Sequence, residues 1–153
     1  MKVHYLKEAS LEEDHVEVHY RKENEEMKMI RDFFLSFHNI MGKKDGAIHR
    51  LYPGSIYYLE VVDRKLFACQ EKEVYQIEGS LGHFLELYSA SGFVQISKST
   101  AVNIRKVVRM KTDFNMRLRL VMDNGEELIL NRNYKKTFLE ALYWLQEADY
   151  EVD

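Results

Sequence analysis

Two hydroxyl groups and one cation lie next to each other in the chain, directly after a run of strand-forming residues. Ser97, Lys98 and Ser99 follow residues 93–96 and precede the apolar pair at 101–102. These polar side chains can donate hydrogen bonds to phosphates and to base edges, and a buried strand has no need of them. The pattern therefore indicates a polar elbow suited to nucleic-acid binding, although charged residues at strand ends also serve solubility alone.

The charge of the chain is unevenly distributed. The whole chain has a net charge of −3, but residues 93–136 hold ten Lys and Arg against four Asp and Glu. Residues 1–46 hold eight Lys and Arg against ten Asp and Glu. A basic patch inside an acidic chain is typical of a protein that binds a specific partner at one surface.

The sequence lacks the motifs that catalytic sites and metal sites require. We find no glycine-rich phosphate loop and no nucleophile elbow, and Cys69 lies in a strand pattern that predicts a buried structural thiol. His15 and His19 have a spacing seen in zinc helices, but their stretch reads as a strand and no third ligand follows a metal pattern. We therefore expect no enzyme activity, no catalytic residue, no metal and no cofactor.

The residues around the elbow predict short strands and two helices. Apolar residues that alternate with polar ones, between turn residues, predict strands at 47–51, 56–62, 66–69, 74–77, 93–96, 107–111, 117–122 and 128–130. Ser80 can cap a helix that runs to about residue 88, and apolar residues on one face predict a last helix at about 134–147. Short strands with one inserted helix and one terminal helix predict a mostly-β fold of the α+β type.

The first 46 residues predict a small strand–strand–helix module. Alternation predicts strands at 3–5 and 16–20, and Asn24 can cap a helix at about 25–41. The apolar stripe of this helix is broad and includes Met27, Ile30, Phe34 and Phe37. The stripe either covers the two strands or docks on the sheet, or it forms a dimer or partner interface.

Length and composition bound the class of protein. The 153 residues fit one domain with a short appended module, which we divide into residues 1–46 and 47–153. Cys69 is the only cysteine, so no intrachain disulfide can form, and the N-terminus lacks the apolar core of a signal peptide. No apolar run approaches membrane-spanning length. We therefore expect a cytoplasmic protein.

Three segments together resemble the LytTR-type DNA-binding domain. Residues 93–103, FVQISKSTAVN, are similar to that family's pattern Phe-x-Arg-x-His-Arg-Ser-x-x-Val-Asn. Asn124-Gly125-Glu126 and residues 131–136, NRNYKK, resemble its Asn-Gly-Glu and Ser-Arg-Arg-Tyr-x-Lys stretches in the same order and at the same spacing. The resemblance covers about residues 55–145. Departures from the family pattern occur at Gln95, Ser97, Lys98, Asn131 and Asn133.

The resemblance implies a β-sandwich that inserts loops, not a recognition helix, into successive major grooves of double-stranded DNA. Carried over by position, the base-reading residues are Lys98 and Arg132, with Lys65 at a less closely aligned third contact. The phosphate-binding residues that the resemblance implies are Ser97, Ser99, Asn133, Lys135 and Lys136. An arginine suits bidentate recognition of guanine, and a lysine donates to the same acceptors with looser geometry.

The resulting prediction is a bacterial transcription regulator of the stand-alone LytTR type. Residues 1–46 are too short for a phospho-receiver domain, and stand-alone relatives imply control by a membrane-bound inhibitor protein. Family sites are direct repeats, so we expect copies to pair on DNA, as a homodimer joined through the helix at 25–41. The alternative is a protein-interaction module whose β domain no longer binds DNA. No small-molecule substrate is expected.

Overall fold

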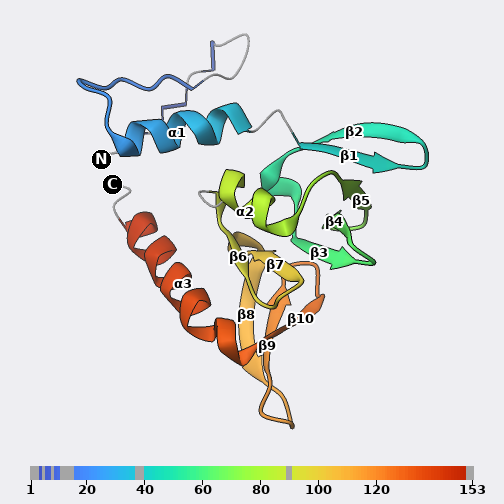
Figure 1. Ribbon diagram of the computed structural model, residues 1–153. Coiled ribbons are helices and arrows are strands. Elements are labelled where there is room, and N and C mark those ends of the chain that lie inside the picture. The colour runs from blue at the N-terminus through green and yellow to red at the C-terminus, as the bar shows by residue number, and fades with distance from the viewer. Residues whose placement is uncertain are drawn as a thin grey trace.

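The computed structural model describes residues 4, 6–7, 9–10, 16–36, 40–88 and 91–150, without the side chains of residues 32, 35–36 and 144–150. Strands occupy the centre of the molecule, helix α1 lies at one end, and helix α3 runs along one side (Figure 1). No helix in this part of the chain is long and apolar enough to span a membrane.

A seven-stranded sheet forms the larger part of the fold. Its strand order is β2-β1-β5-β4-β3-β7-β6, and every neighbouring pair is antiparallel. The strands are β1 (Ile40–Lys44), β2 (Ala47–Leu51), β3 (Tyr58–Val62), β4 (Lys65–Cys69), β5 (Val74–Ile77), β6 (Phe93–Gln95) and β7 (Thr100–Asn103).

A three-stranded sheet and three helices complete the fold. The small sheet has the order β10-β9-β8, with β8 at Val107–Thr112, β9 at Leu118–Met122 and β10 at Glu127–Leu130. The helices are α1 (Glu25–Ser36), α2 (Leu81–Tyr88) and α3 (Lys135–Tyr150). Short 3-10 turns occupy Pro53–Ser55, Ile104–Lys106 and Arg132–Tyr134.

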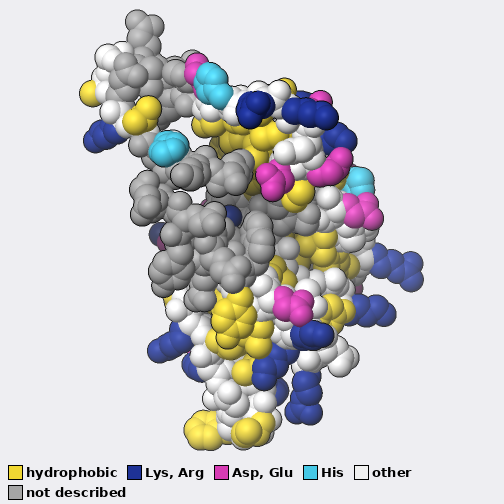
Figure 2. Space-filling view, turned by 90° about the vertical axis from the view of Figure 1, so that its left-hand side faces the viewer, with side chains coloured by type: hydrophobic (Ala, Val, Ile, Leu, Met, Phe, Trp, Pro, Cys, Tyr) yellow, Lys and Arg dark blue, Asp and Glu magenta, His cyan; other side chains and the backbone are white. Residues whose placement is uncertain are grey.

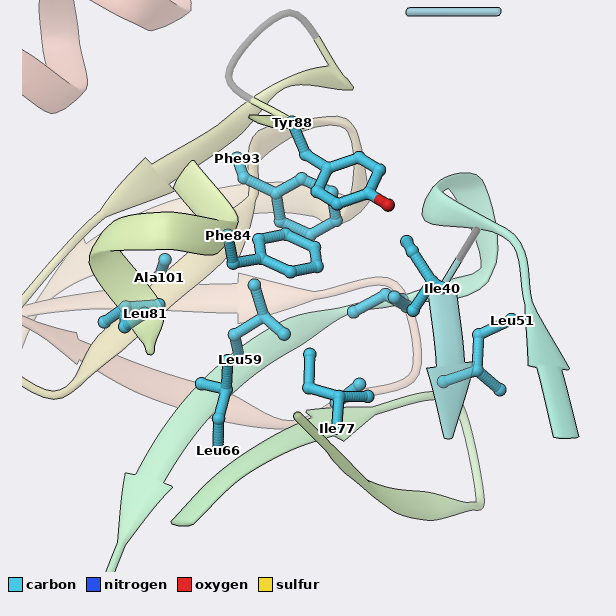
Figure 3. Packing of buried hydrophobic residues seen from close by; sticks show 12 residues of the cluster. Ile40, Leu51, Leu59, Leu66, Ile77, Leu81, Phe84, Tyr88, Phe93 and Ala101 are labelled. Atoms are coloured by element: carbon cyan, nitrogen blue, oxygen red, sulfur yellow. The ribbon is translucent and has the colours of Figure 1, made fainter. Parts of the chain in front are cut away.

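One face of the large sheet packs against α2. Leu59 and Ala101 point to this face, and Phe84 of α2 meets Phe93 edge to face, with ring centroids 5.2 Å apart. Figure 3 shows these aromatic rings, with Tyr88, gathered between α2 and the strands. This first core holds α2, which connects β5 to β6 in the sequence, against the face of the large sheet.

The opposite face of the large sheet packs against the small sheet and α3. Val102 follows Ala101 in β7 and therefore points the other way, because side chains alternate along a strand. It is buried together with Ile96, Leu120 and Phe138, which come from the β6–β7 loop, the small sheet and α3. Two antiparallel sheets with inserted and C-terminal helices confirm the predicted mostly-β fold.

The predicted helix at 25–41 ends earlier than expected. Helix α1 ends at Ser36, and Ile40–Lys44 forms strand β1 of the large sheet. Ile40 and Gly42 are buried while Met41 and Lys43 are exposed, which is the alternation of a strand. Gly42 lies within β1 and lets this strand approach Leu51 and Tyr75 closely. The β1–β2 hairpin also spans the predicted boundary between residues 46 and 47.

The N-terminal segment differs from the predicted strand–strand–helix module. Residues 16–20 form no strand, and the predicted strand at 3–5 lies mostly outside the described residues. Helix α1 begins after Asn24, whose side chain accepts a hydrogen bond from the Met27 N–H at 2.9 Å, so the predicted cap is confirmed. Helix α1 lies against α2, with Met27 and Ile30 half-buried and Phe34 39% exposed. Phe37 lies outside the described residues.

Candidate nucleic-acid interface

The elbow predicted from the sequence is a tight loop between β6 and β7, which we name the Lys98 loop (residues 96–99). The Val61 N–H of β3 donates to the Ser99 carbonyl at 2.8 Å. The side chain of Gln95 donates to the Lys98 carbonyl at 3.3 Å, and the Ser97 hydroxyl accepts from the Ser99 N–H at 3.3 Å. Backbone groups thus hold the loop, and the Lys98 side chain is exposed.

A second loop, the Arg132 loop (residues 131–134), lies beside the first. The Asn131 N–H donates to the Ile96 carbonyl at 2.8 Å, which joins the two loops directly. The Asn131 side chain accepts from the Asn133 N–H at 3.0 Å and caps the 3-10 turn. Arg132 and Asn133 are exposed on this capped turn.

Two lysines occupy the first turn of α3. Lys135 and Lys136 are exposed, and this turn contains no acidic residue. The N-terminus of a helix carries a partial positive charge, so lysine is electrostatically unfavourable there. An anion such as a phosphate would relieve this repulsion and accept from the same helix end.

The tip of the β3–β4 hairpin is a two-residue turn. Asp63 and Arg64 both have positive φ, 49° and 65°, as a type I′ turn requires. Val62 pairs with Lys65 across the turn, and Lys65 is exposed. Ser99 bonds β3 one residue before Val62, so the Lys98 loop and this turn lie at the same end of the large sheet.

Three segments that are distant in sequence therefore converge, and we name them together the cationic end. It comprises residues 63–65, 97–99 and 131–136. Its Lys and Arg residues are Arg64, Lys65, Lys98, Arg132, Lys135 and Lys136. In the described part of the chain none of these six side chains forms an ion pair. Figure 2 shows Lys and Arg side chains projecting from the lower part of the molecule.

The six cations of the cationic end contrast with those of the β8–β9 hairpin. There Lys111 pairs with Glu127, and Arg119 lies 3.7 Å from the same carboxylate. Asp113 accepts from the Arg117 and Arg119 side chains at 2.8 and 3.0 Å. Three of the ten Lys and Arg residues counted at 93–136 thus lie in a network with two carboxylates, which a residue count could not distinguish from the interface.

Asp113 is the centre of that network. Partial burial raises the pKa of its carboxyl, but hydrogen bonds from Arg117, Arg119 and the Asn115 N–H outweigh this effect and lower the pKa to about 2. Its oxygens also accept from the Arg117 N–H at 3.0 Å. The carboxylate therefore fixes the geometry of the residues that connect β8 to β9.

Asn103 and Cys69 have structural roles, and the predicted burial of Cys69 is confirmed. Asn103 is 1% exposed, accepts from the Arg105 N–H at 3.1 Å and donates to the Ile56 carbonyl at 3.0 Å, so it caps backbone groups. Cys69 is buried, and this burial raises the pKa of its thiol to about 11. Among the residues that the structure describes, no group of three or more His, Cys, Asp or Glu is arranged to hold a metal ion. The role of Asn131 in joining the two loops was not predicted.

The family follows from a comparison of the whole sequence. The sequence model of the LytTr DNA-binding domain family matches residues 46–143 of this chain. The chain belongs to the LytTR DNA-binding domain family. The match agrees with the resemblance noted from the motifs, and it contains all three segments of the cationic end.

Several relatives share this LytTR domain. The chain is 28% identical over 98 residues to the sensory transduction protein LytT of Enterococcus faecalis, which covers 64% of this chain and 40% of that protein. It is 32% identical over 82 residues to LytR of Streptococcus agalactiae, covering 54% and 33%. The chain thus spans well under half the length of these two relatives. An uncharacterized HTH-type transcriptional regulator of Staphylococcus aureus is 23% identical over 146 residues, covering 93% and 98%.

A solved structure shows the same fold. The LytTr DNA-binding domain of a putative methyl-accepting/DNA response regulator from Bacillus cereus superposes with a TM-score of 0.62 and 24% sequence identity. The superposition covers 67% of this chain and 95% of that one. The LytTR fold of this chain is therefore shared with an established structure.

Proposed function

We propose that this LytTR protein is a transcription regulator that binds double-stranded DNA through its cationic end. The observation that carries the proposal is the set of six exposed cations that form no ion pair with any residue that the structure describes, presented by segments that backbone hydrogen bonds hold in place. Exposed positive charge on a rigid surface attracts a polyanion and loses little conformational entropy when it binds.

We propose that some of these side chains contact bases and that others contact phosphates. Lys98 and Arg132 extend from loops and Lys65 from the first residue of β4, and all three are proposed to reach base edges in the major groove. The polar residues around them are proposed to bind phosphates and to fix the register on the duplex. These phosphate-binding residues are Ser97, Ser99, Asn133, Lys135 and Lys136.

The proposed placement on DNA comes from the family resemblance, and Lys65 lies two strands away from β7 in the order β4-β3-β7. We propose that the loops enter successive major grooves and that two copies occupy direct repeats, joined through α1. The Staphylococcus aureus relative, which carries the name of a transcriptional regulator and matches nearly the whole chain, supports a regulatory role.

The test is a salt titration of binding to duplex DNA. The observed association constant should fall linearly with salt on a log–log scale, by about 0.9 for each phosphate that is neutralised. A chain that binds no duplex at any salt concentration would contradict the proposal. It would favour instead a protein-interaction module, controlled by an inhibitor protein that a membrane holds.

A further inference from the structure

The connection between β8 and β9 exposes two large apolar side chains. We name residues 114–116 the hairpin tip. Phe114 is 106% exposed and Met116 is 74% exposed, relative to their reference values. In Figure 1 this tip projects from the lower end of the molecule, and Figure 2 shows hydrophobic side chains at the same extremity. Apolar groups this exposed gain free energy when a partner covers them.

Hydrogen bonds hold the hairpin tip, and its geometry conflicts with ordinary residue preference. Met116 has a φ of 60°, a conformation that glycine adopts readily and methionine seldom does. Its N–H donates to the Asp113 carbonyl at 3.0 Å, and the Asp113 carboxylate binds the N–H groups of Asn115 and Arg117. A glycine would satisfy this turn with less strain, so the turn itself does not require the Met116 side chain.

The hairpin tip lies at the cationic end. Leu130 pairs with Leu118, and Arg132 follows Leu130 by two residues while Phe114 precedes Leu118 by four. Both segments leave the small sheet in the same direction. At about 3.3 Å per residue the tip extends roughly 10 Å beyond the Leu118–Leu130 pair. A duplex bound at the Arg132 loop would therefore meet the tip.

We propose that the hairpin tip is an apolar wedge that enters the minor groove next to the major groove occupied by the Arg132 loop. This inference rests on the proposed DNA binding of the cationic end. Phenylalanine and methionine side chains that enter a minor groove part the base stack and bend the duplex. Phe114 is the leading side chain of the wedge, and Met116 supports it.

The experiment uses the full chain and an end-labelled duplex that the parent protein selects from a random-sequence pool. Affinity is measured by titration, and bending by energy transfer between the two labelled ends. Phe114→Ser should lower affinity about tenfold, the scale of one aromatic contact with a base, and should abolish the bend. Met116→Gly should weaken binding in the same direction while it keeps the turn. Phe114→Trp should retain both affinity and bend.

The control is Ile48→Ala on β2, which removes an apolar side chain that is 69% exposed and distant from the cationic end. This variant should bind and bend DNA like the parent. If the parent binds DNA and Phe114→Ser matches it in affinity, or loses affinity without a change in the bend, the wedge is wrong and the proposed function stands. A loss that occurs only when two copies bind adjacent sites assigns the tip to a protein contact and overturns the wedge. A parent chain that binds no duplex overturns both proposals.

Discussion

Arg132 and Arg119 carry the same guanidinium group, but their surroundings give them different roles. Arg119 is bound to Asp113 at 3.0 Å and lies near Glu127, so its charge is already balanced within the protein. Arg132 is exposed on a capped turn and has no ion pair in the described part of the chain. A phosphate or a base can therefore recruit Arg132 without breaking an existing bond, whereas Arg119 would first have to leave its partners.

The pKa of Asp113 predicts a pH dependence of stability. The pKa in the folded protein is about 2, below the ordinary value of about 4 for an unfolded aspartate. A lowered folded-state pKa stabilises the fold above the unfolded value, and this contribution is lost as pH falls from about 4 to about 2. The midpoint of thermal unfolding, measured against pH, should therefore differ most between the parent and Asp113→Asn above this window.

The same comparison separates Asp113 from the other carboxylates. Glu78 and Glu127 also have lowered pKa values, because Lys43 and Lys111 bind them, and they titrate in both proteins. Only the difference between the parent and Asp113→Asn reports on the hairpin network. A difference that stays constant from neutral pH down to about 2 would show that the Asp113 carboxylate is not stabilised by its arginines.

At the scale of elements, strand β1 depends on one glycine. A Cβ atom added to Gly42 would lie 2.7 Å from a Leu51 methyl carbon and 2.7 Å from the Tyr75 Cβ. Such contacts require the backbone of β1 or β5 to move, so Gly42→Ala should cost about 1–3 kcal/mol of unfolding free energy. Gly82→Ala is the matched control, because nothing lies within 4 Å and alanine favours a helix. Denaturant unfolding that ranks Gly42→Ala equal to the control would contradict this packing.

Local patterns predicted most elements but not β1. Turn residues and alternation identified the strands from Ala47 onward except β7, because hairpins carry their signals within a few residues. Ile40 and Met41 continue the three-and-four spacing of the preceding helix, which concealed the alternation of Ile40 and Gly42. The strand exists because it pairs with β2 and β5, and pairing with β5 is a contact between residues far apart in the sequence.

The candidate site was predictable by residue type and not by arrangement. The polar elbow at Lys98 and the segment of Arg132 stood out in the sequence, and the family resemblance connected them. Their contact through the Asn131 N–H and the Ile96 carbonyl requires the two sheets to pack, which no local pattern specifies. For the same reason the sequence could not separate the paired cations of the β8–β9 hairpin from the cationic end.

At the scale of the whole molecule, α1 is placed at the far end from the proposed DNA surface (Figure 1). It lies against α2, and Met29 and Phe34 remain 56% and 39% exposed. We propose that a second copy covers this side of α1. Phe34→Glu should then weaken dimerisation while the fold is retained, because burying an unpaired charge is strongly unfavourable. Light scattering gives the mass and circular dichroism the fold; a folded variant of unchanged mass would contradict the dimer.

The end of the molecule opposite to the cationic end provides a control residue for DNA binding. Lys72 is exposed in the turn between β4 and β5, at the end of β4 opposite to Lys65. The neighbouring Glu71 carbonyl accepts from the Asn124 side chain at 3.3 Å, so this turn lies beside the β9–β10 turn, away from Arg132. Lys72 thus carries the same charge as Lys135 but lies outside the proposed DNA-binding surface.

The most direct test compares Lys135→Ala, Arg132→Ala and Lys72→Ala in salt titrations on the duplex selected by the parent. Lys135→Ala should weaken binding to all duplexes and make the salt slope shallower by about one unit. Arg132→Ala should cost about 1–3 kcal/mol on the selected duplex and relax the preference at one base pair. Lys72→Ala should match the parent. If Lys72→Ala weakens binding as much as the other two variants, or if all three bind like the parent, the cationic end is not the DNA-binding surface.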